Sequence, residues 1–332
     1  MLGELRRLEI ESEALRDNLL GDPSRREVLV YTPPGYDEGG AYPLLMVLPA
    51  FGATHRSLLE ADLWTPSMLG RYEALLAQGR VPPALLVFPD ASNALGGSQF
   101  VDSSVGGAYQ RFLADEVIAA VDQAFRTLAD PAARAVVGRS SGGFGALRLG
   151  LSRGDVFGVV GGHAADAAFE LSLRPLLLKA AIAFEAAGGV EAYATQLRAE
   201  GPKGPFGHDA AFVLACAVAY CPTPTAPFPH LLLPFEPQHA ALRSDVWARW
   251  LRHDPLQMLR EGQELGPLAR FVYLDAGNRD EYGLHFAARM LAEAFHDRGV
   301  EVFHEEFEGG HRGTSWRYER SLPLLLSRLR RE

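Results

Sequence analysis

Short, continuous apolar runs that alternate with helix-like segments constrain the fold of this chain most strongly. The runs are rich in Val, Leu and Phe, as in ALLVFPDA (84–91) and RFVYLDAG (270–277), and amphipathic stretches such as RFLADEVIAAVDQAFRTL (111–128) lie between them. A strand that is apolar on both faces belongs to a parallel sheet covered by helices on both sides. We therefore expect an α/β fold with a mostly parallel central sheet. Its functional groups should gather at the carboxyl ends of the strands. The expected strands span 26–34, 43–51, 84–91, 133–138, 156–164, 270–277 and 301–307.

The stretch 165–259 breaks this alternation. It contains the proline-rich run PTPTAPFPHLLLPFEPQ (222–238) and several aromatic residues, among them Phe212 and Trp247. A structureless loop of this length is unusual within a compact domain. We expect a partly helical cap at 165–259, inserted into a single domain that spans 1–332. Its apolar and aromatic content suits the covering of an apolar ligand, and we expect Trp247 to contact that ligand.

Composition excludes several classes of protein. The hydrophobic content of 48% and the charged content of 22% are typical of a globular chain, and a net charge of −9 without a Lys/Arg cluster argues against nucleic-acid binding. The longest uncharged apolar run, 210–220, is too short to cross a bilayer. No secretory signal is recognisable, so we expect a cytoplasmic protein without a membrane partner. Nothing in the sequence indicates an oligomeric state.

The sequence gives little support for a disulfide, a metal site or a bound cofactor. Cys216 and Cys221 lie within and beside an apolar run, so we expect buried free thiols, with a local disulfide as the alternative. No histidines and carboxylates have the spacing of a metal site, and the glycine-rich segment fits neither a phosphate-binding loop nor a dinucleotide fingerprint. We therefore expect neither a metal nor a cofactor.

The segment RAVVGRSSGGFGALRLG (134–150) contains a candidate nucleophile. Ser140 has Gly138 two residues before it and Gly142 two residues after it, whereas Ser141 lacks this pattern. The apolar run before the serine reads as a strand, and the following residues read as a helix. G-x-S-x-G at such a junction predicts a nucleophile elbow, because a serine on so sharp a turn needs neighbours without a Cβ.

A serine nucleophile needs a base and an acid, which in this kind of fold follow it in the chain. His311, in FEGGHRGTSW, comes after the last expected strand and is the candidate base. His163 also ends a strand, but it precedes the candidate acids, so we expect it to line the pocket instead.

The candidate acids follow the penultimate strand. Asp275, Asp280 and Glu281 lie in VYLDAGNRDEYG, and Asp166 is a further competitor. Asp280 is favoured because it lies in the loop beyond Gly277, where a bend can direct it toward the base. Asp275 is closer to the strand and is expected to hold the loop by hydrogen bonds.

Two backbone amides are expected to form the oxyanion hole. One belongs to Ser141 at the start of the new helix. The other comes from the loop VLPAFGATHRS (47–57), where the Phe51 amide is favoured and Ala50 or Gly52 are alternatives. Phe51 and Gly52 are also expected to contact substrate.

Taken together, these segments resemble the esterase D-like family of the α/β-hydrolases, which includes feruloyl esterases, S-formylglutathione hydrolases, enterochelin esterases and mycolyltransferases. The matching segments include PLLMVLPAFG, RAVVGRSSGGFGALRLGL, YLDAGNRDEYG and EEFEGGHRGTSW. The resemblance implies an α/β-hydrolase fold in which Ser140 is the nucleophile, Asp280 the acid and His311 the base. Two departures stand out: Pro49-Ala50 replaces the family's His-Gly before the oxyanion residue, and Ser141 replaces a frequent Met.

From these residues we expect a serine carboxylic-ester hydrolase, a carboxylesterase that acts on a small-molecule ester through an acyl-enzyme. An acyltransferase with the same triad is one alternative, in which an alcohol or sugar intercepts the acyl group. A non-catalytic binding protein on a hydrolase scaffold is the other.

Overall fold

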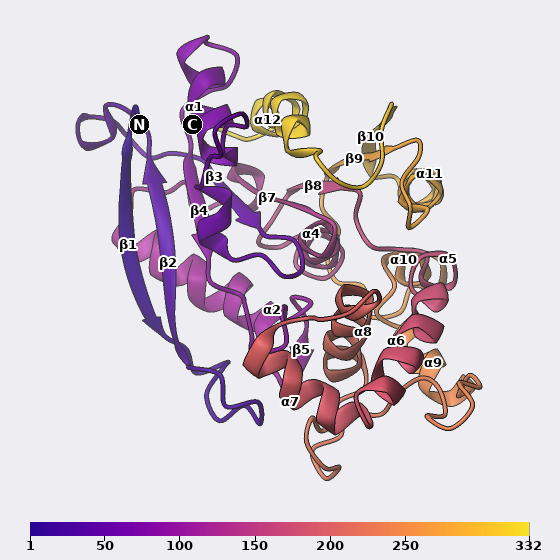
Figure 1. Cartoon of the computed structure of the whole chain (residues 1–332). Coiled ribbons are helices and arrows are strands. Elements are labelled where there is room, and N and C mark those ends of the chain that lie inside the picture. Colours follow the sequence, from indigo (N-terminus) through magenta and orange to yellow (C-terminus); the bar gives the residue numbers. More distant parts are fainter. Residues whose placement is uncertain (332) are drawn as a thin grey trace.

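The structure is a computed structural model that describes residues 1–331. Its centre is an eight-stranded sheet in the order β1-β2-β4-β3-β7-β8-β9-β10 (Figure 1). The pairs β1–β2 and β2–β4 are antiparallel, and the remaining neighbours are parallel. The mostly parallel sheet predicted from the sequence is confirmed. The strands are β1 (Glu4–Glu11), β2 (Arg25–Thr32), β3 (Leu44–Leu48), β4 (Leu85–Pro89), β7 (Arg134–Arg139), β8 (Val159–His163), β9 (Phe271–Gly277) and β10 (Glu301–Phe307); β5 (Asp102–Ser103) and β6 (Gly107–Ala108) form a separate small pair.

The edge strand β1 was not recognised from the sequence. Its eight residues, ELRRLEIE, alternate between exposed and half-buried positions and carry charges on the exposed side. Such a strand lacks the continuous apolar run that marks the central strands. Charged residues on an edge strand also discourage pairing with another chain.

Helices cover both faces of the sheet, as predicted. On one face, α1 (Met68–Ala77) and α12 (Tyr318–Ser327) share a hydrophobic core with side chains of the central strands. The other face is covered by α4 (Ser141–Ser152), α11 (Leu284–Asp297) and a continuous helical stretch made of α2 (Tyr109–Arg111), a π-helical turn (Phe112–Val117) and α3 (Ile118–Ala124). Short 3₁₀ turns occur at Tyr36–Glu38, His55–Leu58, Pro131–Ala133 and Ser315–Arg317.

The chain between β8 and β9 forms a helical layer beyond the carboxyl ends of the strands, at the lower right of Figure 1. Its helices are α5 (Phe169–Ser172), α6 (Arg174–Ala186), α7 (Val190–Glu200), α8 (Gly207–Tyr220), α9 (Ser244–Leu251) and α10 (Pro255–Glu261). The helix α8 is apolar on all sides and is buried within a hydrophobic core of this layer. Cys216 and Cys221 are buried free thiols, as expected.

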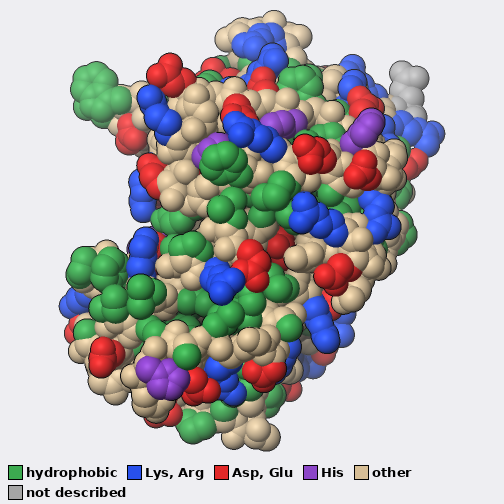
Figure 2. All heavy atoms as spheres, turned by 90° about the vertical axis from the view of Figure 1, so that its right-hand side faces the viewer, with side chains coloured by type: hydrophobic (Ala, Val, Ile, Leu, Met, Phe, Trp, Pro, Cys, Tyr) green, Lys and Arg blue, Asp and Glu red, His purple; other side chains and the backbone are tan. Residues whose placement is uncertain are grey.

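The surface of this helical layer mixes apolar and charged side chains. Leu171, Leu178, Ile182 and Phe286 are the exposed large hydrophobic residues of α5, α6 and α11. Figure 2 shows this side of the molecule, with hydrophobic groups interspersed among acidic and basic ones. Exposed apolar side chains are common at protein surfaces. Among residues 1–331, none of the helices combines the length and the apolarity that a membrane crossing requires.

Candidate active site

Ser140 lies at a strained turn between β7 and α4. Its backbone has φ 55° and ψ −125°, a conformation that residues with a Cβ rarely adopt. A Cβ on Gly138 would lie 2.3 Å from the carbonyl group of Gly142, and a Cβ on Gly142 would lie 2.4 Å from the carbonyl oxygen of Leu48. The close approach of α4 to β7 and to the end of β3 therefore requires both glycines of the motif.

Three of the side chains proposed from the sequence meet in one hydrogen-bonded chain. Ser140 Oγ lies 3.0 Å from His311 Nε2, and His311 Nδ1 lies 2.8 Å from Asp280 Oδ2. The other oxygen of Asp280 accepts a hydrogen bond from the backbone N–H of Tyr282 at 2.9 Å. Because a carboxylate only accepts, His311 donates from Nδ1, and its Nε2 is free to accept the serine proton.

The loop that carries His311 is fixed by contacts on several sides. Glu281 Oε2 accepts the backbone N–H of His311 at 2.8 Å, and Arg139 donates to the His311 carbonyl oxygen at 3.0 Å. A Cβ on Gly277 would lie 2.4 Å from the carbonyl oxygen of Gly309. Gly277 was expected to supply a bend, but its backbone is not left-handed. Its role is instead to let this loop approach β9.

A second Ser–His–Asp chain lies behind the first. His163 Nδ1 is 2.8 Å from Asp275 Oδ1, and His163 Nε2 is 2.9 Å from Ser321 Oγ. All three residues are buried, and none lines the pocket that contains Ser140. The expectation that His163 contacts substrate is therefore corrected: only its backbone carbonyl reaches the elbow, where it accepts the Ser140 N–H at 2.8 Å.

Asp275 belongs to a buried ion-pair network. Its Oδ2 accepts hydrogen bonds from Tyr273 Oη and Arg317 Nε, each at 2.7 Å. Burial acts to raise the pKa of Asp275, but the charge and hydrogen bond of His163, with those of its other partners, hold that pKa below its ordinary value. The network ties β8 and β9 to α12, whereas the sequence predicts that Asp275 holds the loop after β9.

The oxyanion candidates occupy the expected turn. Within residues 1–331, no group accepts a hydrogen bond from the Phe51 N–H, and the Ser141 N–H is in the first turn of α4, where backbone amides lack helical partners. The alternative donor Gly52 is ruled out, because its N–H already donates to the Gly96 carbonyl at 2.8 Å. The Ser141 hydroxyl is turned away and bonds to Gln99 at 2.9 Å.

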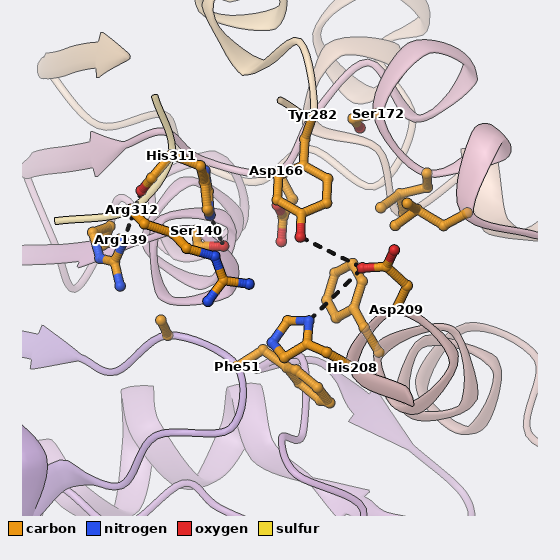
Figure 3. A pocket seen from close by; sticks show the side chains of 14 residues that line it. Phe51, Arg139, Ser140, Asp166, Ser172, His208, Asp209, Tyr282, His311 and Arg312 are labelled. Atoms are coloured by element: carbon orange, nitrogen blue, oxygen red, sulfur yellow. Dashed lines mark hydrogen bonds and ion pairs between the residues drawn. The ribbon is translucent and has the colours of Figure 1, made fainter. Parts of the chain in front are cut away.

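A pocket opens beside Ser140. Figure 3 shows that Ser140, His311, Arg139 and Arg312 lie on one side of it. Its other walls come from the loops after β3, β8 and β9 and from the helical layer; they are formed by Ala50, Phe51, Asp166, Ser172, Leu173, Leu176, His208, Asp209, Phe212 and Tyr282. The mixture of polar and apolar side chains in this lining suits a small molecule.

The structure corrects two of the expected substrate contacts. Trp247, on α9, is buried in the core of the helical layer, and its indole N–H donates to Glu170 at 2.7 Å. Neither Trp247 nor Gly52 lines the pocket. Phe51 does, and its ring packs edge-on against Phe212 with the centroids 5.1 Å apart. The aromatic content of this stretch does not predict which of its rings line the pocket and which pack within the helical layer.

The polar wall opposite Ser140 was not predicted. Asp209, on α8, lies 2.7 Å from Lys179 Nζ and 3.4 Å from Tyr282 Oη, and His208 is beside it (Figure 3). Burial lowers the pKa of His208, and nearby Arg312 lowers it further. Lys179, His208 and Asp209 come from α6 and α8, which no sequence motif marks, whereas Tyr282 lies in the loop after β9 that carries the candidate acids. Among residues 1–331, no cluster of three or more His, Cys, Asp or Glu side chains is arranged to hold a metal ion.

Comparisons with known proteins agree with this architecture. The profile of the family described as "Putative esterase" matches residues 23–320. Among solved structures, a ferulic acid esterase is 17% identical with a TM-score of 0.63, and 98% of this chain and 99% of that chain are covered.

Two bacterial structures are similar in the same way. An S-formylglutathione hydrolase from Agrobacterium tumefaciens is 15% identical with a TM-score of 0.62, over 99% of this chain and 96% of that one. The fluorophosphonate-binding serine hydrolase FphF from Staphylococcus aureus is 14% identical with a TM-score of 0.58, over 98% of this chain and 99% of that one. Together with the sheet order, these likenesses show an α/β-hydrolase fold.

Proposed function

The chain belongs to the putative esterase family and is a carboxylic ester hydrolase, and we propose that Ser140, His311 and Asp280 form its catalytic triad. The observation that carries the proposal is the chain of hydrogen bonds from Ser140 Oγ through His311 to Asp280, at 3.0 and 2.8 Å. It begins at a strained serine whose hydroxyl borders the pocket. Such strain is a common mark of a functional residue.

The reaction proceeds in two halves. Ser140 Oγ attacks the ester carbonyl carbon while His311 Nε2 takes the hydroxyl proton, and the carbonyl oxygen becomes an oxyanion held by the amides of Phe51 and Ser141. The carbon–oxygen bond to the alcohol then breaks, and His311 returns the proton to the leaving alcohol. Water attacks the acyl-enzyme in the same manner, releases the carboxylic acid and restores the Ser140 hydroxyl. Asp280 holds His311 in the tautomer that both halves require.

We propose that the stretch 165–259 acts as a cap that selects the substrate. Leu176 of α6, Phe212 of α8 and Leu173, which lies between α5 and α6, contribute apolar side chains to the pocket wall. An ester with an apolar portion would bury that portion against them.

Labelling with a fluorophosphonate tests the nucleophile. The reagent should modify Ser140 alone, and Ser140→Ala should remove both the label and ester hydrolysis. Ser321 provides an internal control, because it also belongs to a Ser–His–Asp chain but is fully buried. Peptide mapping should therefore find no adduct on Ser321, and Ser321→Ala should still be labelled. An adduct on any serine other than Ser140 would show that the nucleophile is misassigned.

A further inference from the structure

Asp166 is a buried carboxyl in the active-site pocket without a partner of its own. It follows β8, is 7% exposed and lines the same pocket as Ser140. Its Oδ2 is buried without a hydrogen bond, and among residues 1–331 no donor or cation pairs with either of its oxygens. In Figure 3 the carboxyl projects into the pocket beside Tyr282.

Other buried carboxyls of this region are satisfied. Asp254 accepts hydrogen bonds from the backbone N–H groups of Ala168, Phe169 and Leu256 at 2.8–3.0 Å. Asp275 is bonded to a histidine, a tyrosine and an arginine. A buried carboxyl left unpaired lowers stability, so its presence in a pocket calls for a ligand that pairs with it.

The backbone around Asp166 is held in place at both ends. Ala164 N–H donates to the Asp275 carbonyl oxygen at 2.7 Å, and the Asp254 carboxylate receives two amides just after Asp166. Ala164 and Ala168 both have positive φ, at 41° and 52°. The backbone that carries the carboxyl is thus held in place before any ligand binds, as suits a recognition group.

We propose that Asp166 is a specificity-determining residue that accepts a hydrogen bond from a hydroxyl or protonated amine on the ester substrate. This inference rests on the proposed function, because it takes the pocket beside Ser140 to be the ester site. The neighbouring wall is apolar at Leu173, Leu176 and Phe212. The substrate class is therefore an ester that has an apolar portion and a hydrogen-bond donor placed to reach Asp166.

The electrostatics of the pocket favour such a donor. Burial raises the pKa of Asp166 to about 7; His311 acts to lower this pKa and Asp280 acts to raise it. A hydrogen-bond donor on the substrate replaces the solvation that burial removed from the carboxylate. A substrate without the donor therefore loses more binding free energy here than it would beside an exposed carboxylate.

Matched esters that differ by one donor test the proposal. Ethyl 3-hydroxybutanoate and ethyl 3-methylbutanoate place OH or CH₃ on the acid. The pair 2-hydroxyethyl and propyl butanoate places them on the alcohol, and 2-(dimethylamino)ethyl and 3-methylbutyl butanoate compare a protonated amine with its hydrocarbon isostere. Acid release in a pH-stat gives kcat/KM for each ester. In at least one pair, we expect kcat/KM to be about tenfold or more higher for the ester that carries the donor than for its isostere, which is the effect of one hydrogen bond.

Asp166→Leu should abolish this preference by lowering kcat/KM for the donor ester far more than for its isostere. A merely structural role would lower both values equally. Asp209→Asn is the matched control from the opposite wall, and it should keep the preference ratio within about threefold, because Asp209 is already paired.

Two results would overturn the inference: no pair shows a donor preference, or the preference survives Asp166→Leu. Fluorophosphonate labelling of Ser140 in the same preparations distinguishes a failure of the Asp166 proposal from a failure of the proposed function. Labelled enzyme without donor preference refutes only the role of Asp166, whereas unlabelled enzyme refutes the triad.

Discussion

Replacing Asp166 by Asn should make the protein more stable, and the gain should grow with pH. The carboxyl is buried in the pocket and unpaired, and burial raises its pKa from the ordinary 3.8 to about 7. Below about pH 4 the group is protonated in both the folded and the unfolded chain. Between about pH 4 and pH 7 the unfolded chain releases the proton while the folded chain retains it, so the free energy of unfolding falls as the pH rises.

The magnitude follows from the two pKa values. They differ by about three, and each unit corresponds to about 1.4 kcal/mol, so ionisation of Asp166 removes about 4 kcal/mol of stability by pH 8. Asn has nearly the same shape and does not titrate. The stability of Asp166→Asn relative to wild type should therefore rise by about 4 kcal/mol from pH 4 to pH 7 and remain constant above that range.

The groups that face Asp166 must be considered in the comparison. They are His311 after β10, Asp280 and Tyr282 after β9, and Cys216 and Tyr220 of α8. Cys216 and Tyr220 have pKa values well above their ordinary ones because they are buried, so both stay neutral in this range. His311 and Asp280 are present in both proteins, so their own contributions to stability largely cancel in the difference.

Urea denaturation at pH 4, 5, 6, 7 and 8, followed by fluorescence and circular dichroism, measures this difference, provided that the two probes give one transition. Asp254→Asn is the control. Burial also raises the pKa of Asp254, to about 6, but three backbone amides donate to its carboxylate, so the Asn variant should lose stability. A difference for Asp166→Asn that does not change with pH, or a variant less stable than wild type at pH 8, would refute the reasoning.

Further predictions concern the remaining site residues. Asp280→Asn should lower kcat by about 10³- to 10⁴-fold without changing the unfolding transition, since Asn favours the wrong imidazole tautomer; a steady-state kcat near wild type would point to another acid. Asp275→Asn should instead lower the free energy of unfolding by about 3–5 kcal/mol in a denaturation series, because it breaks a buried ion-pair network. Phe212→Ala should change the ratio of kcat/KM between a long-chain and an acetate ester, whereas Trp247→Ala should lower the melting temperature and leave that ratio unchanged; equal ratios in both variants would contradict the pocket lining. Gly142→Ala should lower both stability and kcat, because its Cβ would lie 2.4 Å from a backbone oxygen; wild-type behaviour would show that the turn can relax.

The sequence predicted the features that depend on local pattern. Continuous apolar runs indicated the central strands, because a strand buried on both faces cannot carry polar residues. The spacing of Gly138 and Gly142 selected Ser140 over Ser141, because the strained turn at the nucleophile leaves no room for a Cβ at either position; Gly138 contacts the turn itself, whereas Gly142 contacts the end of β3. The order of serine, acid and histidine led to His311, which the structure brings within 3.0 Å of Ser140. The catalytic roles of these residues stay predictions.

The tertiary structure decided which groups from distant segments face one another. Asp275 and Asp280 are five residues apart, but only the structure turns Asp280 toward His311 and Asp275 toward His163 and Arg317. The structure also places Trp247 outside the pocket. The sequence of an amphipathic helix predicts that one of its faces is buried, but it does not predict which residues cover that face.

Asp166 marks the limit of the sequence most clearly. Its residue type and its place after a strand made it a competitor for the catalytic acid, but its role depends on the partners that it lacks. The absence of a donor near a carboxyl is a property of every element packed around it, here α8 and the loops after β9 and β10. Local pattern fixes backbone conformation through short-range sterics and burial, whereas desolvation and pairing of charges arise only when distant segments pack together.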